Sequence, residues 1–319
     1  MQKLVIVDGN AILHRAFHAL PPLTDKDGNL THAIYGFVSM LLKIDSDLVP
    51  SHLLVCFDRP EPTFRKTMYV GYQAKRPKMD EGLSSQIERV KKVVTSMKIP
   101  IYELAGFEAD DVIGTLASQA TKKQFDEVVI ITGDRDILQL VNDTVHVYMP
   151  IQGLTNAKMF SEKEVEEKYG IKPLQIIDYK ALAGDSSDNY PGVRGIGPKT
   201  ASELLKRYDS IEGIYKAIKN KDNGVELLKE KTIQALSEYA EDCAMAKKLA
   251  TIVTDVPVVI DVEKTRLHDL NTKEAIQKLE DLGFKSLIKR LGNHKNMKAL
   301  KHEIKNPEKK EENKQMSLL

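Results

Sequence analysis

The sequence has only two cysteines and almost no excess charge, and each shortage excludes a class of protein. Cys56 and Cys243 stand far apart without the paired spacing of a zinc or redox site, so we interpret both as small packing residues. Basic and acidic residues nearly cancel, leaving a formal net charge of +1. Any contact with a nucleic acid must therefore come from local charge rather than from the charge of the whole chain.

Long apolar runs are absent as well. The opening stretch MQKLVIVDGN has too short an apolar part for a signal peptide, and no later run approaches the roughly 20 residues of a membrane-spanning helix. We therefore expect a cytoplasmic protein with no membrane partner. A hydrophobic content of 42% over 319 residues still allows a substantial buried core.

Short apolar runs alternate with amphipathic segments in the first half of the chain. The β-branched runs lie at residues 3–7, 52–57, 127–132 and 145–149. This alternation predicts an α/β domain with a mainly parallel sheet covered by helices.

Helical patterns dominate the second half of the chain. They lie near residues 173–183, 198–207, 225–249 and 272–290. Only a brief run at 257–260 could form a strand there, so we expect a smaller helical domain packed on the sheet domain. From about residue 291, lysine, glutamate and asparagine replace large apolar residues, as is typical of a mobile tail.

Acidic residues follow each of the first three predicted strands. Asp8 follows the first strand, Asp58 the second, and Asp134 and Asp136 the third. Ligands of an open parallel sheet gather at the carboxyl ends of its strands. We therefore expect these four carboxylates to converge at one edge of the sheet.

Two further acidic motifs have the same chemistry. The stretch GFEADD places Glu108, Asp110 and Asp111 at a helix start, and GDSSD places Asp185 and Asp188 one helical turn apart. Taken singly, each group has an ordinary explanation, because acids complement the dipole of a helix start or cap it. Taken together, so many carboxylates are tolerable chiefly if cations neutralise them.

The donor set predicts which cations. Ligation by oxygen alone, without cysteine or histidine, favours Mg²⁺ or Mn²⁺. Mg²⁺ usually takes one or two protein carboxylates, so this many acids indicates two ions. Two ions about 4 Å apart can activate a water and stabilise a departing oxygen in phosphodiester hydrolysis. The predicted chemistry is metal-dependent phosphoryl transfer.

The stretch PGVRGIGPKTASELLKRY is a candidate phosphate grip. Gly192, Gly195 and Gly197 allow a tight turn and close backbone approach, and Pro198 and Lys199 begin a helix. Exposed amides at that helix start would hold a nucleic-acid phosphate without reading its base. With the preceding helix this forms a helix-hairpin-helix; the alternative is a plain helix cap and turn.

A second basic stretch, RPEPTFRKTMYVGYQAKRPKM, directly follows Asp58. Its basic residues are Arg59, Arg65, Lys66, Lys75, Arg76 and Lys78, against only Glu61. Phe64, Tyr69 and Tyr72 are interleaved with them and could stack on unpaired bases. The alternative interpretation is a solvated charged helix.

Six stretches of the chain have counterparts, in the same order, in one known family. They are LVIVDGNAILHRAFHAL, CFDRPEPTFRKTMYVGYQAKRP, GFEADDVIGTLA, TGDRDILQLV, LAGDSSDNYPGVRGIGPKTA and LGFKSLIKRL. The chain from residue 1 to about 291 thereby resembles the 5′-nuclease and flap-endonuclease family, specifically the bacterial 5′-3′ exonuclease found alone or as the N-terminal region of DNA polymerase I.

The resemblance implies an architecture and a set of metal ligands. It implies a PIN-like catalytic domain over 1–170 with a helical arch over about 59–99, and a helix-hairpin-helix domain over 171–291. The ligands of the first ion would be Asp8, Asp58, Glu108, Asp110 and Asp111, and those of the second Asp134, Asp136, Asp185 and Asp188. The ions would be Mg²⁺, with Mn²⁺ able to substitute, and a K⁺ ion would bind the carbonyls of the hairpin.

The resemblance also implies a DNA-binding surface. Its residues would be Arg15, Phe17, Lys66, Tyr69, Tyr72, Gly192, Arg194, Gly195, Gly197, Lys199 and Thr200. The arch would admit a single-stranded 5′ end, and the hairpin would grip the duplex.

One arch residue departs from the family pattern. The family usually reads Tyr-Lys-Ala-x-Arg, with the lysine reaching toward the scissile phosphate, whereas YQAKR places Gln73 at that position. Glutamine can donate a hydrogen bond but supplies no positive charge. Lys75 would point to the opposite side of a helix, so Arg76 or Arg65 is the expected source of charge. We expect Gln73 to lower the rate without abolishing hydrolysis.

The chain closes on QMSLL after a lysine-rich linker at 292–314. Residues 315–319 resemble the short peptide by which bacterial DNA-processing proteins dock on the sliding clamp, with contacts from Gln315, Met316, Leu318 and Leu319. A random tail is the alternative. The same ending predicts a freestanding nuclease with no polymerase domain fused after it.

Together with the acidic residues and the hairpin, the resemblance implies a monomeric, nucleoid-associated, structure-specific 5′ nuclease that acts on DNA flaps, nicks and RNA primers. A PIN-type ribonuclease could share the acids, but such enzymes usually lack the hairpin and the arch. A non-catalytic, clamp-tethered junction-binding module is the second rival, motivated by Gln73. The complete acid set counts against it.

Overall fold

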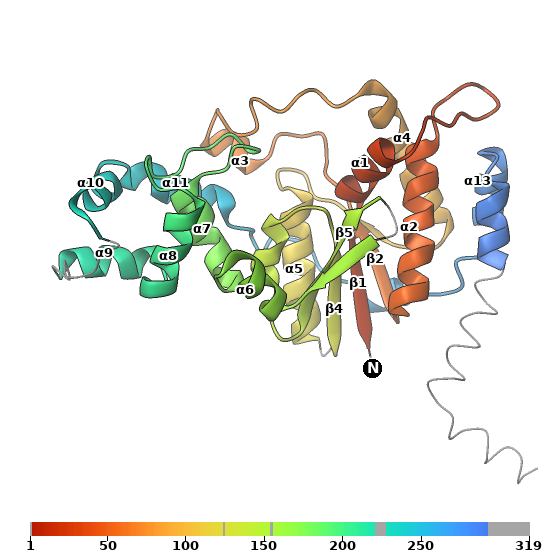
Figure 1. The fold of residues 1–319 in the computed structure, drawn as a ribbon. Helices are drawn as coiled ribbons and strands as arrows, with labels where there is room; N and C mark the ends of the chain where they lie inside the picture. Colours follow the sequence, from red (N-terminus) through yellow and green to blue (C-terminus); the bar gives the residue numbers. More distant parts are fainter. Residues whose placement is uncertain (1, 124, 154–155, 221–227, 293–319) are drawn as a thin grey trace, which may run out of the picture.

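The computed structural model describes residues 2–123, 125–153, 156–220 and 228–292. Within these ranges one sheet has the strand order β3-β2-β1-β4-β5-β6 (Figure 1). The strands are β1 (Lys3–Asp8), β2 (His52–Cys56), β3 (Ile101–Tyr102), β4 (Glu127–Ile131), β5 (Val145–Gln152) and β6 (Asn156–Phe160). All neighbouring pairs are parallel except β5 and β6, so the predicted mainly parallel sheet is confirmed.

The apolar pattern of the sequence did not predict the two short edge strands, and one possible strand that it did suggest is not formed. β3 has only two residues, and β6 is a half-exposed antiparallel strand, so neither carries a long buried run. Residues 257–260 form no strand. Their backbone instead binds the Gln119 side chain, which donates to the Val258 carbonyl at 2.7 Å and accepts from the Ile260 N–H at 2.9 Å.

The residues of β1 alternate between two cores, one on each face of the sheet. Val5 and Val7 lie in one core, and Leu4 and Ile6 lie in the other. The first core is covered by α1 (Gly9–Ala19), α2 (His32–Leu48) and α4 (Glu81–Ser96), and the second by α5 (Ala109–Lys122). Burial on both faces explains the near-continuous apolar runs of the strands.

A helical domain extends to one side of the sheet (Figure 1). Its helices are α6 (Glu162–Tyr169), α7 (Ile176–Ala183), α8 (Pro198–Tyr208), α9 (Ile211–Lys219), α10 (Glu230–Glu238) and α11 (Ala240–Ala250), with the 3₁₀ turn η2 (Pro173–Gln175) before α7. Leu182 and Leu204 belong to the same core as the residues of α5, so the two domains share one apolar interior.

After α11 the chain returns to the sheet domain. It forms α12 (Val262–Thr265) and α13 (Lys273–Asp281), and Ala275 and Leu279 of α13 lie in the core under α2 and α4. The last segment of the helical domain predicted for residues 171–291 therefore packs on the sheet domain instead. No helix of the described residues is long and apolar enough to cross a membrane.

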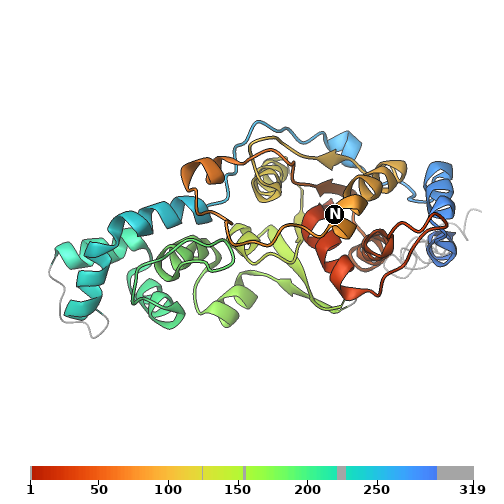
Figure 2. The same ribbon diagram turned by 90° about the horizontal axis from the view of Figure 1, so that it is seen from above.

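The segment between β2 and α4 runs out toward the helical domain and back again (Figure 2). Residues 59–80 of this segment contain one short helix, α3 (Phe64–Met68). The arch predicted for 59–99 also includes α4, but the buried side chains of Leu83 and Val90 place that helix in the layer that covers the sheet.

Candidate metal centre and nucleic-acid interface

The strand order reverses between β1 and β4, and acidic residues gather at the carboxyl end of this junction. Asp8 ends β1 and caps α1, where its carboxylate accepts a hydrogen bond from the Ala11 N–H at 2.9 Å. The Thr132 hydroxyl, just after β4, donates to the same carboxylate at 2.6 Å and accepts from the Asp134 N–H at 2.9 Å. Thr132, which the sequence did not single out, therefore ties the ends of the two strands together.

Asp58 joins the end of β2 to the start of α5. Its carboxylate accepts from the N–H of Ala109, the first residue of α5, at 2.7 Å, and its own N–H donates to the Asn10 side chain at 3.0 Å. Free amides at a helix start favour an anionic partner, so this bond fixes where α5 begins. Asp110, the next residue of α5, is thereby held within electrostatic reach of Asp8 and Asp134.

Asp8, Asp58, Asp110 and Asp134 form the first acidic group. Asp134, which the resemblance assigned to the second ion, is placed here because it is the carboxylate that acts most strongly on Asp110, although it also acts on Asp136. Burial, and then Asp134 and Asp8, raise the pKa of Asp110 well above its usual range. Burial, with Asp58 and Asp134 close by, raises the pKa of Asp8 to about 7 against its two hydrogen bonds. A divalent cation would remove this repulsion, and an all-oxygen donor set fits Mg²⁺ or Mn²⁺.

A second acidic group consists of Asp136, Asp185 and Asp188. Their carboxylate oxygens lie within 4.8 Å of one another. The Lys180 ammonium of α7 contacts both Asp136 and Asp185. Although burial opposes it, Lys180 holds the pKa of Asp185 at about 2, whereas burial and Asp134 raise the pKa of Asp136 to about 7. A second cation fits this group as well.

Lys180 is a residue that the sequence analysis missed. It lies five residues before Asp185, on the helix that leads into the GDSSD loop. A lysine one turn and a half before a candidate metal ligand is the signal that could have identified it. Its ammonium supplies positive charge at the group where the second cation is predicted.

The turn after α3 docks on the second acidic group. Arg76 Nη2 lies 2.7 Å from Asp188 Oδ1, and the Gln73 side chain donates to the same oxygen at 3.3 Å. The Gln73 N–H also donates to the Asp188 carbonyl at 2.8 Å, with Gln73 in the left-handed region at φ 55°. The Asn189 amide closes the contact by donating to the Gly71 carbonyl at 2.7 Å.

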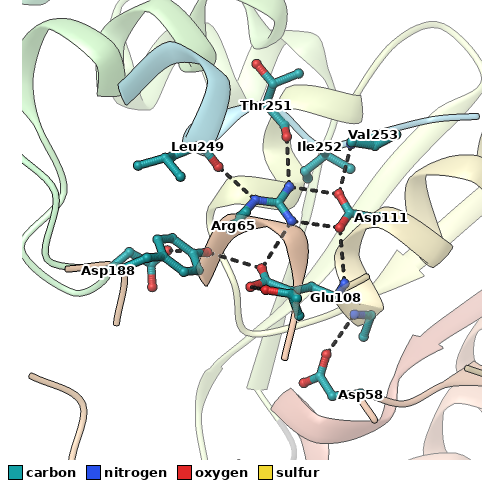
Figure 3. A network of polar contacts seen from close by, with 12 residues as sticks. Asp58, Arg65, Glu108, Asp111, Asp188, Leu249, Thr251, Ile252 and Val253 are labelled. Atoms are coloured by element: carbon teal, nitrogen blue, oxygen red, sulfur yellow. Dashed lines mark hydrogen bonds and ion pairs between the residues drawn. The ribbon is translucent and has the colours of Figure 1, made fainter. Parts of the chain in front are cut away.

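The basic residues that could supply charge from the arch differ in their surroundings. Arg76 contacts Asp188 of the second acidic group, while Lys75 is exposed to solvent. Arg65 is only 2% exposed, and its guanidinium faces Asp111 at 2.7 and 2.8 Å (Figure 3). A guanidinium enclosed in this way does not present its charge to a phosphate, so the structure disagrees with that expected role of Arg65.

Asp111 does not join the carboxylates that face the junction of β1 and β4. Besides Arg65, its oxygens accept from the Glu108 N–H at 3.1 Å and the Val253 N–H at 2.9 Å. These bonds use the four acceptor positions of a carboxylate. The predicted role of Asp111 as a metal ligand therefore conflicts with its surroundings in this structure.

Glu108 lies between the two acidic groups. Its carboxylate accepts from the Tyr72 hydroxyl at 3.1 Å and the Thr63 hydroxyl at 3.3 Å, and Arg65 Nη1 lies 3.4 Å away. Burial, together with Asp111, raises its pKa to about 7 although Arg65 opposes the shift. Glu108 could share a cation with the first acidic group.

The glycine loop leads from α7 into α8, as the helix-hairpin-helix interpretation requires. Gly195 adopts φ 92°, and Gly197 caps α8 with an open approach to the first amides of that helix. Val193 and Ile196 are buried and anchor the loop in the core. Among the predicted contact residues near this loop, Arg194 and Lys199 are exposed and Thr200 is half-buried.

The remaining predicted DNA contacts differ in their availability. Lys66 is exposed. Arg15 donates to the Gly153 carbonyl at 2.8 Å, and the Phe17 ring packs on His32. Tyr69 packs against the core.

Tyr72 is 4% exposed and stacks on Tyr190 at 6.5 Å between ring centroids. A ring enclosed in this way cannot stack on a base without moving. The expected base-stacking role of Tyr72 therefore conflicts with this structure.

The raised pKa values predict how pH and metal ions affect stability. The pKa of Asp8, Glu108 and Asp136 is about 7 in the folded, metal-free protein and is near 4 in the unfolded chain, so the folded state binds more protons between these values. We expect the melting temperature of the EDTA-treated protein to fall as pH rises from about 5 to 8, and Mg²⁺ to raise it more at pH 8 than at pH 5.5. Calorimetry at three pH values measures both effects, and a Mg²⁺ shift independent of pH would contradict the interpretation.

Two family models match the sequence. Residues 3–170 match the N-terminal resolvase-like domain of 5′-3′ exonucleases, and residues 171–274 match the C-terminal SAM fold of 5′-3′ exonucleases. The two matches follow one another along the chain.

Named relatives align with the chain over most of its length. It is 43% identical over 291 residues to DNA polymerase I of Bacillus subtilis (strain 168), an alignment that covers 91% of this chain and 32% of the polymerase. It is 38% identical over 289 residues to a 5′-3′ exonuclease of Aquifex aeolicus (strain VF5), covering 91% of this chain and 95% of the exonuclease. The chain thus spans about a third of the length of the polymerase.

Solved structures share the fold. A bacteriophage T5 D15 flap endonuclease in complex with DNA and metal ions superposes with a TM-score of 0.63 at 19% identity, covering 93% of this chain and 99% of that chain. The catalytic core of Rad2 in complex with a DNA substrate gives a TM-score of 0.53 at 16% identity, with coverages of 90% and 92%. The predicted PIN-like sheet domain with a smaller helical domain is therefore confirmed. Together with the sequence matches, this places the chain in the 5′-3′ exonuclease family.

Proposed function

We propose that this protein is a structure-specific 5′ nuclease that hydrolyses phosphodiesters of DNA flaps, nicks and RNA primers with two divalent cations. The observation that carries the proposal is the convergence of two acidic groups, from strand ends far apart in sequence, beside a glycine hairpin that opens a helix. The names of its relatives support the direction of attack, because the Aquifex protein is a 5′-3′ exonuclease. Mg²⁺ is the proposed ion in the cell, and Mn²⁺ the proposed substitute.

The residues that would hold the cations follow from the two groups. Asp8, Asp58, Asp110 and Asp134 would hold one, with Glu108 beside them, and Asp136, Asp185 and Asp188 the other. When bound, the two ions supply an activated water and stabilise the departing oxygen.

Two side chains of the chain itself would add positive charge at this centre. Arg76 lies against Asp188, and this contact supports a role in which its guanidinium would face the charge that develops on a phosphate. Lys180 balances Asp136 and Asp185 before a cation arrives. The charge that the family pattern places at the arch lysine, where this chain has Gln73, would thus come from Arg76.

The hairpin would set which phosphodiester reaches the acids. Free amides at the start of α8 bind a duplex phosphate without reading sequence. Asp185 and Asp188 lie in the loop that joins α7 to this hairpin, and the Val193 N–H binds the Leu182 carbonyl at 2.8 Å. A duplex held at α8 would therefore lie at a fixed offset from the second acidic group. A K⁺ ion among the hairpin carbonyls is part of this proposal.

A 5′-labelled double-flap duplex tests the function. We expect cleavage near the junction in Mg²⁺ and none in EDTA or in Asp134→Asn. Tight binding of the flap with no cleavage in Mg²⁺ would favour the junction-binding module instead. Cleavage of single-stranded RNA with no preference for the flap would favour the PIN-type ribonuclease.

Gln73→Lys tests the unusual arch position. Residue 73 lies against Asp188, so a lysine there would bring an ammonium to the second acidic group where glutamine brings only an amide. We expect turnover of saturating flap substrate to rise about 10-fold, with Gln73→Met as the uncharged control. Unchanged turnover with unchanged substrate affinity would show that Arg76 alone supplies the needed charge.

The clamp-docking peptide at 315–319 lies outside the described residues, and we propose it from the sequence alone. Deleting these five residues should abolish binding to an immobilised bacterial sliding clamp while cleavage of free flap DNA persists. Retained clamp affinity in the truncated protein would exclude Gln315, Met316, Leu318 and Leu319 as the contact. A monomer is the proposed state in solution.

A further inference from the structure

We infer that Arg65, Asp111 and Gln139 are positioning residues that fasten one stretch of chain, residues 249–253, to both acidic groups. We call this stretch the strap. It leaves the end of α11 in the helical domain and returns to the sheet domain. The inference assigns Asp111 a role other than metal ligation, and its kinetic readout rests on the proposed nuclease function.

Arg65 makes four hydrogen bonds at this junction. Its Nε donates to the Leu249 carbonyl at 2.9 Å and its Nη2 to the Thr251 carbonyl at 2.8 Å (Figure 3). The other N–H groups face Asp111, and Nη1 also lies 3.4 Å from Glu108 Oε2. Four of the five donors of the guanidinium thus form hydrogen bonds here, and the ion pair with Glu108 adds to them.

Asp111 completes the junction from the side of α5. Its carboxylate is fully buried and binds Arg65 through both oxygens. It also accepts the N–H of Val253 on the strap and the N–H of Glu108 at the cap of α5. The pair therefore links the strap, the base of the arch and the start of the helix that carries Asp110.

Gln139 performs the same function from the side of the second acidic group. It lies in the 3₁₀ helix η1 (Asp136–Leu140), which begins at Asp136. Its amide donates to the Ala250 carbonyl at 3.0 Å and accepts from the Ile252 N–H at 2.9 Å. The same amide donates to the Asp136 carbonyl at 2.9 Å.

The three side chains alternate along the strap and leave it little freedom. Arg65 takes the carbonyls of Leu249 and Thr251, Gln139 takes the groups of Ala250 and Ile252, and Asp111 takes the last amide. Buried polar groups that are fully paired are costly to rearrange. A shift of α11 would therefore be transmitted to the starts of both α5 and η1. Duplex binding in the helical domain is thereby coupled to the geometry of the acids.

The experiment compares Arg65→Lys, Asp111→Asn and the double variant in the full-length protein. Mn²⁺ binding without DNA is measured by electron paramagnetic resonance, and turnover is measured on saturating flap substrate. We expect each single variant to weaken Mn²⁺ binding by a similar factor, about 5-fold, and to lower turnover about 10-fold. Mn²⁺ affinity and turnover of the double variant should be no lower than those of the more impaired single variant, since both changes disrupt the same junction.

Two outcomes would overturn the inference. If Asp111→Asn weakened Mn²⁺ binding at least 10-fold more than Arg65→Lys, Asp111 would be a ligand. If Arg65→Lys left both Mn²⁺ affinity and turnover unchanged, the pair would be structural only. Because Mn²⁺ binding needs no cleavage, these readouts survive a failure of the proposed nuclease function, which would appear as wild-type protein that binds Mn²⁺ but does not cut.

Gln139→Met guards against variants that fail to fold, because it removes the strap bonds without leaving a buried charge. Gln175→Met is its matched control. Gln175 is also buried and donates to backbone carbonyls, of Leu205 and Asp209, but within the helical domain. We expect both variants to lower the melting temperature, and only Gln139→Met to weaken Mn²⁺ binding. Equal Mn²⁺ affinities in the two variants would contradict the coupling.

Discussion

Replacing Asp110 by asparagine is expected to lower the rate of flap cleavage by about 10³-fold, or about 4 kcal/mol. Asp110 lies at the start of α5, where Asp134 and Asp8 approach it from the ends of β4 and β1. The substitution keeps the shape of the side chain but removes a charge that a cation would require. Single-turnover cleavage in Mg²⁺ measures the effect.

The same variant should leave the metal-free protein at least as stable as the wild type. Burial and the neighbouring carboxylates oppose a charge on Asp110, so a neutral amide relieves repulsion rather than breaking a favourable contact. Calorimetry in EDTA compares the two proteins. A lower melting temperature would mean that the Asp110 carboxylate stabilises the fold through a contact unrelated to metal binding.

Glu230→Gln is the matched control for the alternative interpretation that Asp110 only complements the dipole of its helix. Glu230 is also an acid in the first turn of a helix, α10, but it is exposed and lies in the helical domain. If first-turn acids acted here only on the helix dipole, the two variants would have similar small effects on stability and none on cleavage. Cleavage by Asp110→Asn within 10-fold of the wild-type rate would favour that interpretation.

The acidic centre could be predicted because its members are marked by local signals. Asp8, Asp58 and Asp134 each follow a short apolar run, and parallel strands bring their carboxyl ends to one edge whatever their separation in sequence. The loop with Asp185 was located differently, by the paired acids of GDSSD ahead of the glycine hairpin. The periodicity of the chain therefore identified the four inner strands of the sheet and the candidate metal ligands that follow the first three of them.

The junction around the strap could not be predicted in this way. Arg65 stands in a basic stretch that the sequence assigns to nucleic-acid contact or to a solvated helix, and Asp111 stands 46 residues further along among the other candidate ligands. Only the packing of the strap over both side chains buries them together. Lys180 was missed for a similar reason, because its contact with Asp136 depends on the start of η1 lying against α7 in three dimensions.

The glycines of the hairpin show the same limit at the level of single residues. The sequence treats Gly192, Gly195 and Gly197 alike, as sources of a tight turn and close approach. In the structure Gly195 satisfies a backbone requirement at φ 92°, while Gly192 and Gly197 have ordinary φ values and differ in their surroundings. Which glycine serves folding and which serves binding follows only from the neighbouring atoms.

Gly192→Ala is expected to destabilise the protein by about 3 kcal/mol, or roughly 6 °C in melting temperature. A Cβ at this position would lie 2.2 Å from the Gly184 nitrogen and 2.4 Å from the Leu182 carbonyl oxygen. These backbone atoms cannot step aside easily, because Gly184 N–H binds the Lys180 carbonyl and Leu182 O binds the Val193 N–H, each at 2.8 Å. Thermal and urea denaturation measure the loss.

Gly197→Ala separates the effect of the loop on protein stability from its effect on duplex binding. Gly197 has extended backbone angles of φ −95° and ψ −179°, and nothing lies within 4 Å of a Cβ there, so stability should change by less than about 0.5 kcal/mol. The added methyl would stand between a phosphate and the first amides of α8, and duplex affinity, measured by fluorescence anisotropy, should fall about 10-fold. If Gly197→Ala bound duplex normally, the start of α8 would not be the phosphate site.

For Gly192→Ala, a melting temperature equal to that of the wild type would contradict the prediction. The loop would then not be fixed against α7, and nothing in the structure would hold the hairpin at a constant offset from the acidic residues.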